Sequence, residues 1–314
     1  MAPLCPARLF VVSLSLLVSA IAATSNASTI LVVPNANLTG GTKWQLTFED
    51  NFNTVDASRW RLHNDCSTNN NCAQNKELQV YMASQIRAEK GKLVIEATNQ
   101  SYTSPAAGTR QYRSGRMDSS GSFAQQYGRF EARIKLPTGQ GMWPAFWLMP
   151  RGGRCWPTDG EIDIMEYIGN KKPKAIHGNF HFGQQCSKNL HSDASVCGTT
   201  GKAIDVALNN EYHVYAAEWT PTSISWFFDG HLYYKLDSSQ CTNKAPFFIP
   251  AKPFYIIFNF AVGGGWPGNP TPTTIFPQRL YVDYVRVYKH VGAVSFPVLG
   301  DAAQYVPSNA TNRP

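Results

Sequence analysis

The chain of 314 residues predicts an all-β fold, a sandwich of two large, curved antiparallel sheets. Strand signals are frequent along it, whereas apolar periodicity typical of a helix of ten or more residues is scarce. The chain is 43% hydrophobic and 16% charged, so it can bury one large core. Its length exceeds that of a small sandwich, and we therefore expect long loops and a concave face that can hold a polymer.

The N-terminal residues have the pattern of a secretory signal. Arg8 precedes an apolar run over residues 9–22 that ends in small residues and is too short for a comfortable transmembrane helix. We predict a signal peptide over 1–22, a flexible Asn/Thr/Ser-rich arm over 23–42, one domain over 43–290 and a polar C-terminal tail over 291–314. The protein is therefore expected to be secreted and extracellular, with no membrane partner.

The cysteines agree with export. Removal of Cys5 with the signal leaves six of the seven cysteines, an even number that favours disulfides in an exported chain. We favour two short loops, Cys66–Cys72 and Cys186–Cys197, which leaves Cys155–Cys241. Sequons that predict a glycoprotein, where the host glycosylates, occur at Asn26, Asn37, Asn99 and Asn309.

The first clear strand within the domain is residues 127–136. Apolar and charged side chains alternate there, as in a strand with one buried face. The apolar face holds Phe130, Ala132, Ile134 and Leu136.

Further strands follow towards the C-terminus. Residues 224–228 and 232–236 flank Asp229-Gly230, a favoured two-residue hairpin turn. Residues 254–260 are continuously apolar except for one Asn, which suits a central strand covered on both faces. Residues 282–288, rich in Val and Tyr, close the series.

Three carboxylates within six residues carry the functional prediction. In a strand Glu161 and Asp163 point to one face, but Glu166 points to the other, because its offset from Glu161 is odd. A β-bulge between Asp163 and Glu166 would return Glu166 to the face of the other two. Crowded like charges are unfavourable for stability, but cleavage of a glycosidic bond needs one ionised and one protonated carboxyl group.

Other interpretations of these polar residues compete. A solvated acidic strand would keep an edge soluble, but the odd spacing and the neighbouring aromatic residues argue against it. Clustered carboxylates also bind calcium, but the bulky residues between them leave no loop to wrap an ion. His177, His181 and Asp159 offer a metal set without a further ligand at a recognised spacing, so we predict no zinc or other metal site at these residues.

Tryptophans lie close to the acids in the sequence. Trp143 and Trp147 share the segment 141–147, Trp156 stands five residues before Glu161, and Trp266 follows three glycines. Sugar rings present C–H faces that pack on aromatic rings, so these residues together predict a saccharide cleft. Each of them alone would be interpreted as a core residue.

The segments 160–166 and 143–147 together resemble glycoside hydrolase family 16, in its bulged-strand, laminarinase-like branch. The resemblance extends from Trp44 to Tyr288. Its further blocks are residues 77–81, 114–117, 127–133 and 282–288. It implies a β-jelly roll with a concave substrate cleft and an endo-acting, retaining enzyme that cleaves β-1,3-glucan or mixed β-1,3/1,4-glucan.

The resemblance also implies roles for single residues. Glu161 is the nucleophile, Glu166 the acid/base, and Asp163 orients the nucleophile. The expected substrate-binding residues are Arg116, Trp143, Trp147, Trp156, His181 and Trp266.

The chain departs from the family pattern at two positions. Lys76 stands where the family often has Asn. Asn51 stands where relatives carry a Glu linked to a structural calcium ion, although Asp283 is retained. We therefore predict no required cofactor and leave a structural calcium ion open.

Several functions compete on these residues. A cell-wall glucan transglycosylase would use the same acids, but relatives with that role tend to lack the bulge. Non-catalytic glucan-recognition relatives have lost the glutamates, whereas Glu161 and Glu166 are both present. Galactan-active hydrolases such as agarases and carrageenases share the fold and the acids, but the aromatic surroundings favour a neutral glucan.

The expected partner is therefore a polysaccharide, and we expect a monomer. The formal net charge is +7, but no run of five Lys or Arg residues occurs. We interpret this as a diffusely basic surface and predict no nucleic-acid partner.

Overall fold

The computed structural model describes residues 30–32, 43–66, 74–169, 175–190, 203–205, 211–239 and 247–291. Within these ranges the chain forms strands and one short 3₁₀ turn at Ala83–Gln85, as the predicted all-β fold requires. No helix in this part of the chain has the length and apolar character needed to cross a membrane.

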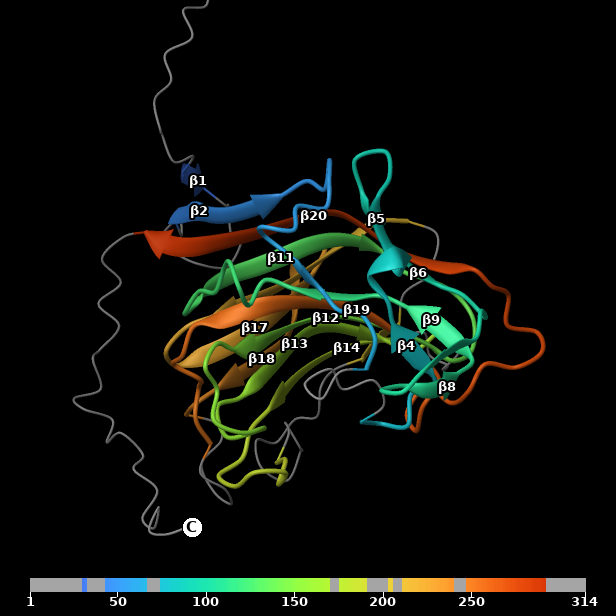
Figure 1. The fold of residues 1–314 in the computed structure, drawn as a ribbon. Helices are drawn as coiled ribbons and strands as arrows, with labels where there is room; N and C mark the ends of the chain where they lie inside the picture. Colours follow the sequence, from blue (N-terminus) through green and yellow to red (C-terminus); the bar gives the residue numbers. More distant parts are fainter. Residues whose placement is uncertain are drawn as a thin grey trace, which may run out of the picture.

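Two curved antiparallel sheets stack on each other (Figure 1). Among the described residues the first sheet has nine strands, in the order β1-β2-β20-β11-β16-β17-β18, with β6 beside β20 and β5 beside β6. They are β1 (Ile30–Val32), β2 (Lys43–Asp50), β5 (Ile86–Ala88), β6 (Leu93–Ala97), β11 (Gly128–Lys135), β16 (His213–Trp219), β17 (Ser223–Phe228), β18 (His231–Asp237) and β20 (Gln278–Val291).

The second sheet carries the acidic strand in its interior. Its seven strands, counted over the same ranges, have the order β15-β14-β13-β12-β19-β10-β3. They are β3 (Arg61–Leu62), β10 (Arg116–Asp118), β12 (Met142–Pro150), β13 (Glu161–Tyr167), β14 (Ala175–His181), β15 (Ala203–Asp205) and β19 (Phe254–Val262). Two small ribbons complete the strands: β4 (Gln79–Tyr81) pairs with β9 (Tyr112–Ser114), and β7 (Tyr102–Ser104) with β8 (Gly108–Arg110).

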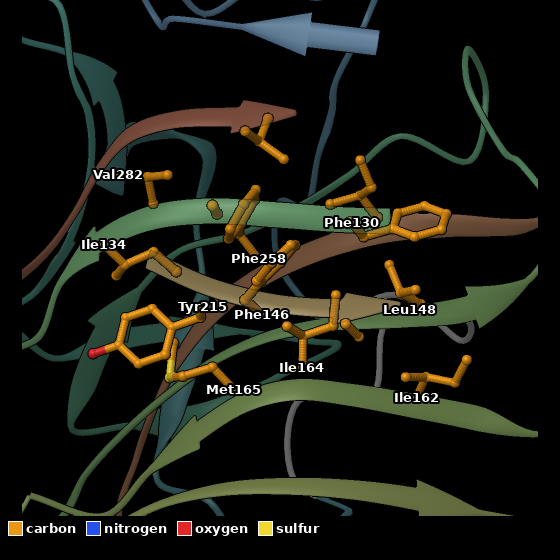
Figure 2. Close-up of a cluster of buried hydrophobic side chains, with 14 of the residues drawn as sticks. Phe130, Ile134, Phe146, Leu148, Ile162, Ile164, Met165, Tyr215, Phe258 and Val282 are labelled. Carbon is orange, nitrogen blue, oxygen red and sulfur yellow. The ribbon is translucent and has the colours of Figure 1, made fainter. Parts of the chain in front are cut away.

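The core lies between the two sheets (Figure 2). The first sheet contributes Phe130, Ile134, Tyr215 and Val282, and the second contributes Phe146, Leu148, Ile162, Ile164, Met165 and Phe258. The rings of Phe146 and Phe258 stack with centroids 4.8 Å apart. The apolar face predicted for residues 127–136 is confirmed, because its four side chains are all buried in this core.

The predicted hairpin and central strand are also confirmed. Asp229 and Gly230 join β17 to β18 with φ values of 46° and 79°, the left-handed backbone that a two-residue hairpin turn needs. Strand β19 pairs with β12 on one side and β10 on the other. Strand β20 is longer than the expected 282–288, because one edge of it pairs with β6 at its start and with β2 at its end.

Most of the predicted terminal segments lie outside the described residues. Residues 30–32 of the expected arm form β1, which pairs with β2. The signal segment 1–22, the other residues of the arm and the tail after residue 291 are not among the described ranges. Of the four sequons Asn99 alone is within them, and it is exposed.

The observed disulfide corrects the predicted pairing. Cys155 bonds to Cys186, 31 residues away, with Cα atoms 5.5 Å apart. The expected pairs Cys186–Cys197 and Cys155–Cys241 are therefore wrong. The loop before β13 and the loop after β14 leave the same end of two neighbouring strands, which brings distant cysteines together without a short loop. Cys66 is also disulfide-bonded, and its expected partner Cys72 lies outside the described residues.

Candidate active site

The predicted β-bulge is present in β13. The register of β13 shifts between Asp163 and Glu166 against β14, and β12 also shows a register shift beside this segment. The successive residues Ile164 and Met165 both enter the core, with exposures of 1% and 0% (Figure 2). Two successive inward side chains return Glu166 to the face that carries Glu161 and Asp163.

A tryptophan of the opposite sheet supports the bulge. Trp226 of β17 is fully buried, and its indole Nε1 donates a hydrogen bond to the backbone carbonyl of Asp163 at 2.7 Å. Gly178 of β14 makes room for this ring, since a Cβ there would lie 2.5 Å from Cδ1 of Trp226. Because a bulge disrupts the ladder locally, a bond from across the core fixes its backbone at the residue between the two glutamates.

Replacing Trp226 by Phe is expected to lower both stability and kcat. The buried carbonyl loses its indole donor, at a cost of about 1–3 kcal/mol, and a loosened bulge misplaces Glu166, which lowers kcat by roughly tenfold or more. Urea unfolding and steady-state kinetics measure the two effects.

Trp219 provides the matched control for this variant. It is equally buried, and its indole donates to the carbonyl of Pro250 at 3.0 Å, away from the bulge. The Trp219→Phe variant should lose similar stability and keep its kcat. Equal kcat losses in the two variants would contradict a specific role for Trp226.

Each outer carboxylate accepts a hydrogen bond from an indole N–H. Trp156 Nε1 lies 2.6 Å from Glu161 Oε2, and Trp143 Nε1 lies 3.0 Å from Glu166 Oε1. Both bonds stabilise the ionised form of the glutamate that accepts them. The side chain of Glu161 is 15% exposed, so the site stays open to a reactant while excluding most of the solvent.

His181 lies against the central acid. Its Nε2 is 3.1 Å from Asp163 Oδ2 and 3.9 Å from Glu161 Oε1. Its Nδ1 lies 2.7 Å from the side-chain amide of Asn189, which holds the ring from the other side. The imidazole is thus placed to balance the negative charge of the acids.

The pKa values of the glutamates and of the histidine all rise. Burial, and next the charge of Asp163, raise the pKa of Glu161 to about 8. The same two causes raise the pKa of Glu166 well above its usual range. Burial alone would lower the pKa of His181, but its hydrogen bond to Asp163 and the charges of the acids raise it to about 10. At neutral pH a cationic His181 therefore faces two glutamates that tend to hold their protons. Glycosidic cleavage proceeds from the fraction of molecules in which Glu161 has lost its proton and Glu166 retains one.

These shifts predict how stability depends on pH. The folded chain holds protons on Glu161 and Glu166 that the unfolded chain, with a glutamate pKa of about 4.3, releases. The free energy of unfolding should therefore fall as pH rises from about 5 to 8, and the raised pKa of His181 extends the fall towards pH 10.

The Glu161→Gln variant tests this dependence, because it removes one of the shifted carboxyl groups. It should match the wild type near pH 5 and exceed its stability near pH 8.5 by on the order of 1–3 kcal/mol. Urea unfolding at several pH values gives the comparison. A stability difference that does not change with pH would contradict the raised pKa of Glu161.

The other expected substrate-binding residues surround the acids. The indole of Trp147 donates to Asn259 Oδ1 at 2.7 Å, and the guanidinium of Arg116 lies 5.1 Å from the centre of the Trp147 ring. The ring of Trp266 meets the ring of Trp143 edge to face, with centroids 5.3 Å apart. The six thus form three contacting pairs. Trp143–Trp266 and Trp156–His181 contact the acids directly, and Arg116–Trp147 lies beside Asp163, because Trp147 pairs with Asp163 between β12 and β13; we call these six residues the aromatic surface.

Sequence reasoning missed several residues that support this surface. Asn259 accepts from Trp147 and donates to the hydroxyl of Tyr81 at 3.2 Å. Its signal in the sequence was a lone amide within the apolar run 254–260. Asn189 and Trp226 had no such signal, because their partners are set by the packing of distant segments.

Asn51 and Asp283, which stand at the position of the family's structural calcium ion, do not fit a calcium ion. Both carboxylate oxygens of Asp283 are bound by cations: Lys92 Nζ lies 2.6 Å from Oδ1, and Arg133 lies 2.6 Å from Oδ2. Burial would raise the pKa of Asp283, but these two cations lower it. Asn51 is exposed and supplies no charge. Calcium needs about six to eight oxygen ligands, and an ammonium and a guanidinium group already hold the carboxylate.

Within the described ranges, the acidic cluster is the group of residues whose geometry most resembles a metal site. Glu161, Asp163 and His181 offer ligand atoms within 4.8 Å of one another. The raised pKa of His181, about 10, keeps its ring protonated at neutral pH, so that it has no free lone pair for a metal. The cluster is therefore better described as acids whose negative charge is balanced by the His181 cation than as a metal site.

The comparisons with known proteins agree with this geometry. A family model described as glycosyl hydrolases family 16 matches residues 64–286. The chain belongs to this family. It is 38% identical over 264 residues to glucan endo-1,3-beta-glucosidase A1 of Niallia circulans, covering 78% of this chain and 38% of that protein. It is 37% identical over 267 residues to a beta-glucanase of Rhodothermus marinus, covering 79% of this chain and 86% of that protein.

Solved structures of the family share the fold. The endo-beta-1,3-glucanase of Pyrococcus furiosus superposes with a TM-score of 0.71 at 34% identity, covering 84% of this chain and 98% of that one. The family 16 chain thus spans nearly all of that solved structure, but about two-fifths of the Niallia protein. The jelly-roll fold implied by the resemblance is confirmed.

Proposed function

We propose that this family 16 chain is a secreted, endo-acting, retaining hydrolase of β-1,3-glucan or mixed β-1,3/1,4-glucan. The bulge in β13 carries the proposal, because it puts Glu161 and Glu166 on one face with Asp163 between them. The endo-β-1,3-glucanase names of the relatives support the substrate class. The Cys155–Cys186 disulfide supports secretion, since disulfides persist in oxidising compartments.

The first chemical step forms a glycosyl-enzyme. The ionised carboxylate of Glu161 attacks the anomeric carbon while Glu166 gives its proton to the departing glycosidic oxygen. The raised pKa of Glu166 keeps that proton available at neutral pH. The hydrogen bond from Trp156 favours the ionised form of Glu161 before attack.

The second step releases the sugar. Glu161 is esterified and neutral, so the pKa of Glu166 falls and its carboxylate can take a proton from water. The water attacks the anomeric carbon and expels Glu161, which returns the sugar with its original configuration. Neither step needs a cofactor, and we propose that a monomer with its polysaccharide is sufficient.

Product sizing tests the proposal. The protein is incubated separately with laminarin, lichenan, agarose and carrageenan, and the products are separated by size. We expect a ladder of short oligosaccharides from laminarin, from lichenan as well if mixed linkages are accepted, and no cleavage of the galactans. Cleavage of a galactan alone would overturn the glucan assignment, and products longer than the starting chains would indicate a transglycosylase.

A further inference from the structure

Two loops flank the proposed nucleophile. Glu161 is the first residue of β13 and pairs with His181, the last residue of β14. Residues 151–160 lead into β13 and residues 182–190 follow β14, so both loops leave the sheet beside Glu161. The position of this carboxylate is therefore sensitive to how the two loops are held.

The loops are joined beside Trp156. Cys155, its neighbour in the chain, bonds to Cys186 in the second loop. The backbone N–H of Ser187 donates to the carbonyl of Trp156 at 2.8 Å. The disulfide thus fixes the backbone at Cys155, and the hydrogen bond fixes it at Trp156.

An ion-pair cluster anchors the rest of the first loop. The buried carboxylate of Asp159 accepts a hydrogen bond from the backbone N–H of Arg154 at 2.6 Å and meets Lys252 Nζ at 3.0 Å. These contacts hold the base of the loop, but they do not reach across to the second loop. Within the described residues, the disulfide and the Ser187 hydrogen bond join the two loops beside Trp156.

Trp156 needs such a link, because the core does not hold its ring. Trp156 as a whole residue is 40% exposed, and it is one of three large apolar residues with at least that exposure in the described ranges. Its indole nevertheless donates to Glu161 at 2.6 Å, and its ring lies 5.7 Å from the ring of His181. A half-exposed ring keeps one rotamer only if its backbone is fixed.

We propose that the Cys155–Cys186 disulfide is a positioning device for the nucleophile, which holds the indole N–H of Trp156 on Glu161. The inference rests on the proposed function, since it assigns the disulfide a part in the reaction of Glu161. Reduction of the bond to two thiols by a dithiol reductant removes the covalent link between the loops, and the indole of Trp156 then leaves the carboxylate. Activity then depends on the oxidised state of the protein, which fits an extracellular enzyme.

A disulfide that merely stabilises the fold would behave differently. Loss of such a bond lowers the free energy of unfolding but leaves the pKa of Glu161 unchanged. Loss of the Trp156 hydrogen bond raises that pKa, because the ionised form loses a donor. The acid limb of the pH profile of kcat/KM, which reports ionisation of the nucleophile, then moves to higher pH.

The test is a cycle of three variants: Trp156→Phe, Cys155→Ser with Cys186→Ser, and all three substitutions together. The profile of kcat/KM against pH is measured on a polysaccharide that the wild type cleaves, together with Tm. We expect the acid limb to rise by about one pH unit in each variant. The triple variant should be no worse than Trp156→Phe, because the disulfide acts through the tryptophan.

Two controls separate the outcomes. Cys66→Ser removes another disulfide, distant from Trp156 in the sequence, and should lower Tm without moving the acid limb. A carbon-13 NMR titration of the Glu161 carboxyl, assigned with Glu161→Gln, needs no substrate and should show the same rise in pKa. An unmoved pKa and acid limb in the Cys155→Ser, Cys186→Ser variant would overturn the proposal. An inactive wild type would overturn the proposed function instead, and the titration would still decide the role of the disulfide.

Discussion

The Glu161→Gln variant is expected to lose about four orders of magnitude or more in kcat. Gln keeps the size of the side chain and an oxygen that can accept the hydrogen bond of Trp156. It cannot form the glycosyl-enzyme, because the neutral amide is not a competent nucleophile. Steady-state kinetics on laminarin measure the loss.

Binding separates this chemical loss from a structural one. The substitution leaves Trp143, Trp147 and Trp266 of the aromatic surface untouched, so calorimetry with a laminari-oligosaccharide should give a Kd close to that of the wild type. Glu89, which is exposed beside Arg87, provides the matched control. Its Gln variant should retain full kcat, and near-normal hydrolysis by Glu161→Gln would remove Glu161 from the mechanism.

The parts of the fold that the sequence predicts follow from local rules. The alternation in 127–136 and the Asp229-Gly230 turn each depend on a few neighbouring residues, and both were confirmed. The bulge in β13 could be predicted as well, because the odd offset of Glu166 from Glu161 leaves a single extra residue as the simplest way to one shared face.

The residues that position the site could not be predicted in the same way. The Cys155–Cys186 bond depends on β13 and β14 being neighbours, which no spacing between cysteines reveals. The bond from Trp226 to the bulge crosses the core over 63 residues of chain, and Gly178 matters only because that ring approaches it. Such contacts are set by the stacking of two sheets and not by any local pattern.

The two cations that bind Asp283 could not be predicted from the sequence for the same reason. The resemblance implied a calcium ligand at this residue, and Asn51 already departed from the pattern. The sequence did not show that Lys92 and Arg133 converge on both oxygens of Asp283 from two other strands or loops. These two cations neutralise the negative charge of Asp283, as a divalent ion would, but they need no shell of six or more oxygen ligands.

The Glu166→Gln variant is expected to lose about three orders of magnitude or more in kcat on laminarin, since the departing sugar oxygen no longer receives a proton. The loss should depend on the leaving group. From a dinitrophenyl β-glycoside of a laminari-oligosaccharide, dinitrophenolate departs without needing a proton. Formation of the glycosyl-enzyme therefore stays fast, and only its hydrolysis is slow. A burst of dinitrophenol followed by slow turnover measures both steps.

Azide then distinguishes the catalytic roles of the two glutamates. In Glu166→Gln it attacks the glycosyl-enzyme without needing a base, so turnover should recover and give the β-glycosyl azide. In Glu161→Ala no glycosyl-enzyme forms, and azide in the space left by the carboxylate should give the α-glycosyl azide. The configuration of the azide product, read by proton NMR, therefore assigns each carboxyl group to its side of the sugar. The same azide anomer from both variants would contradict the division of roles that the bulge in β13 predicts.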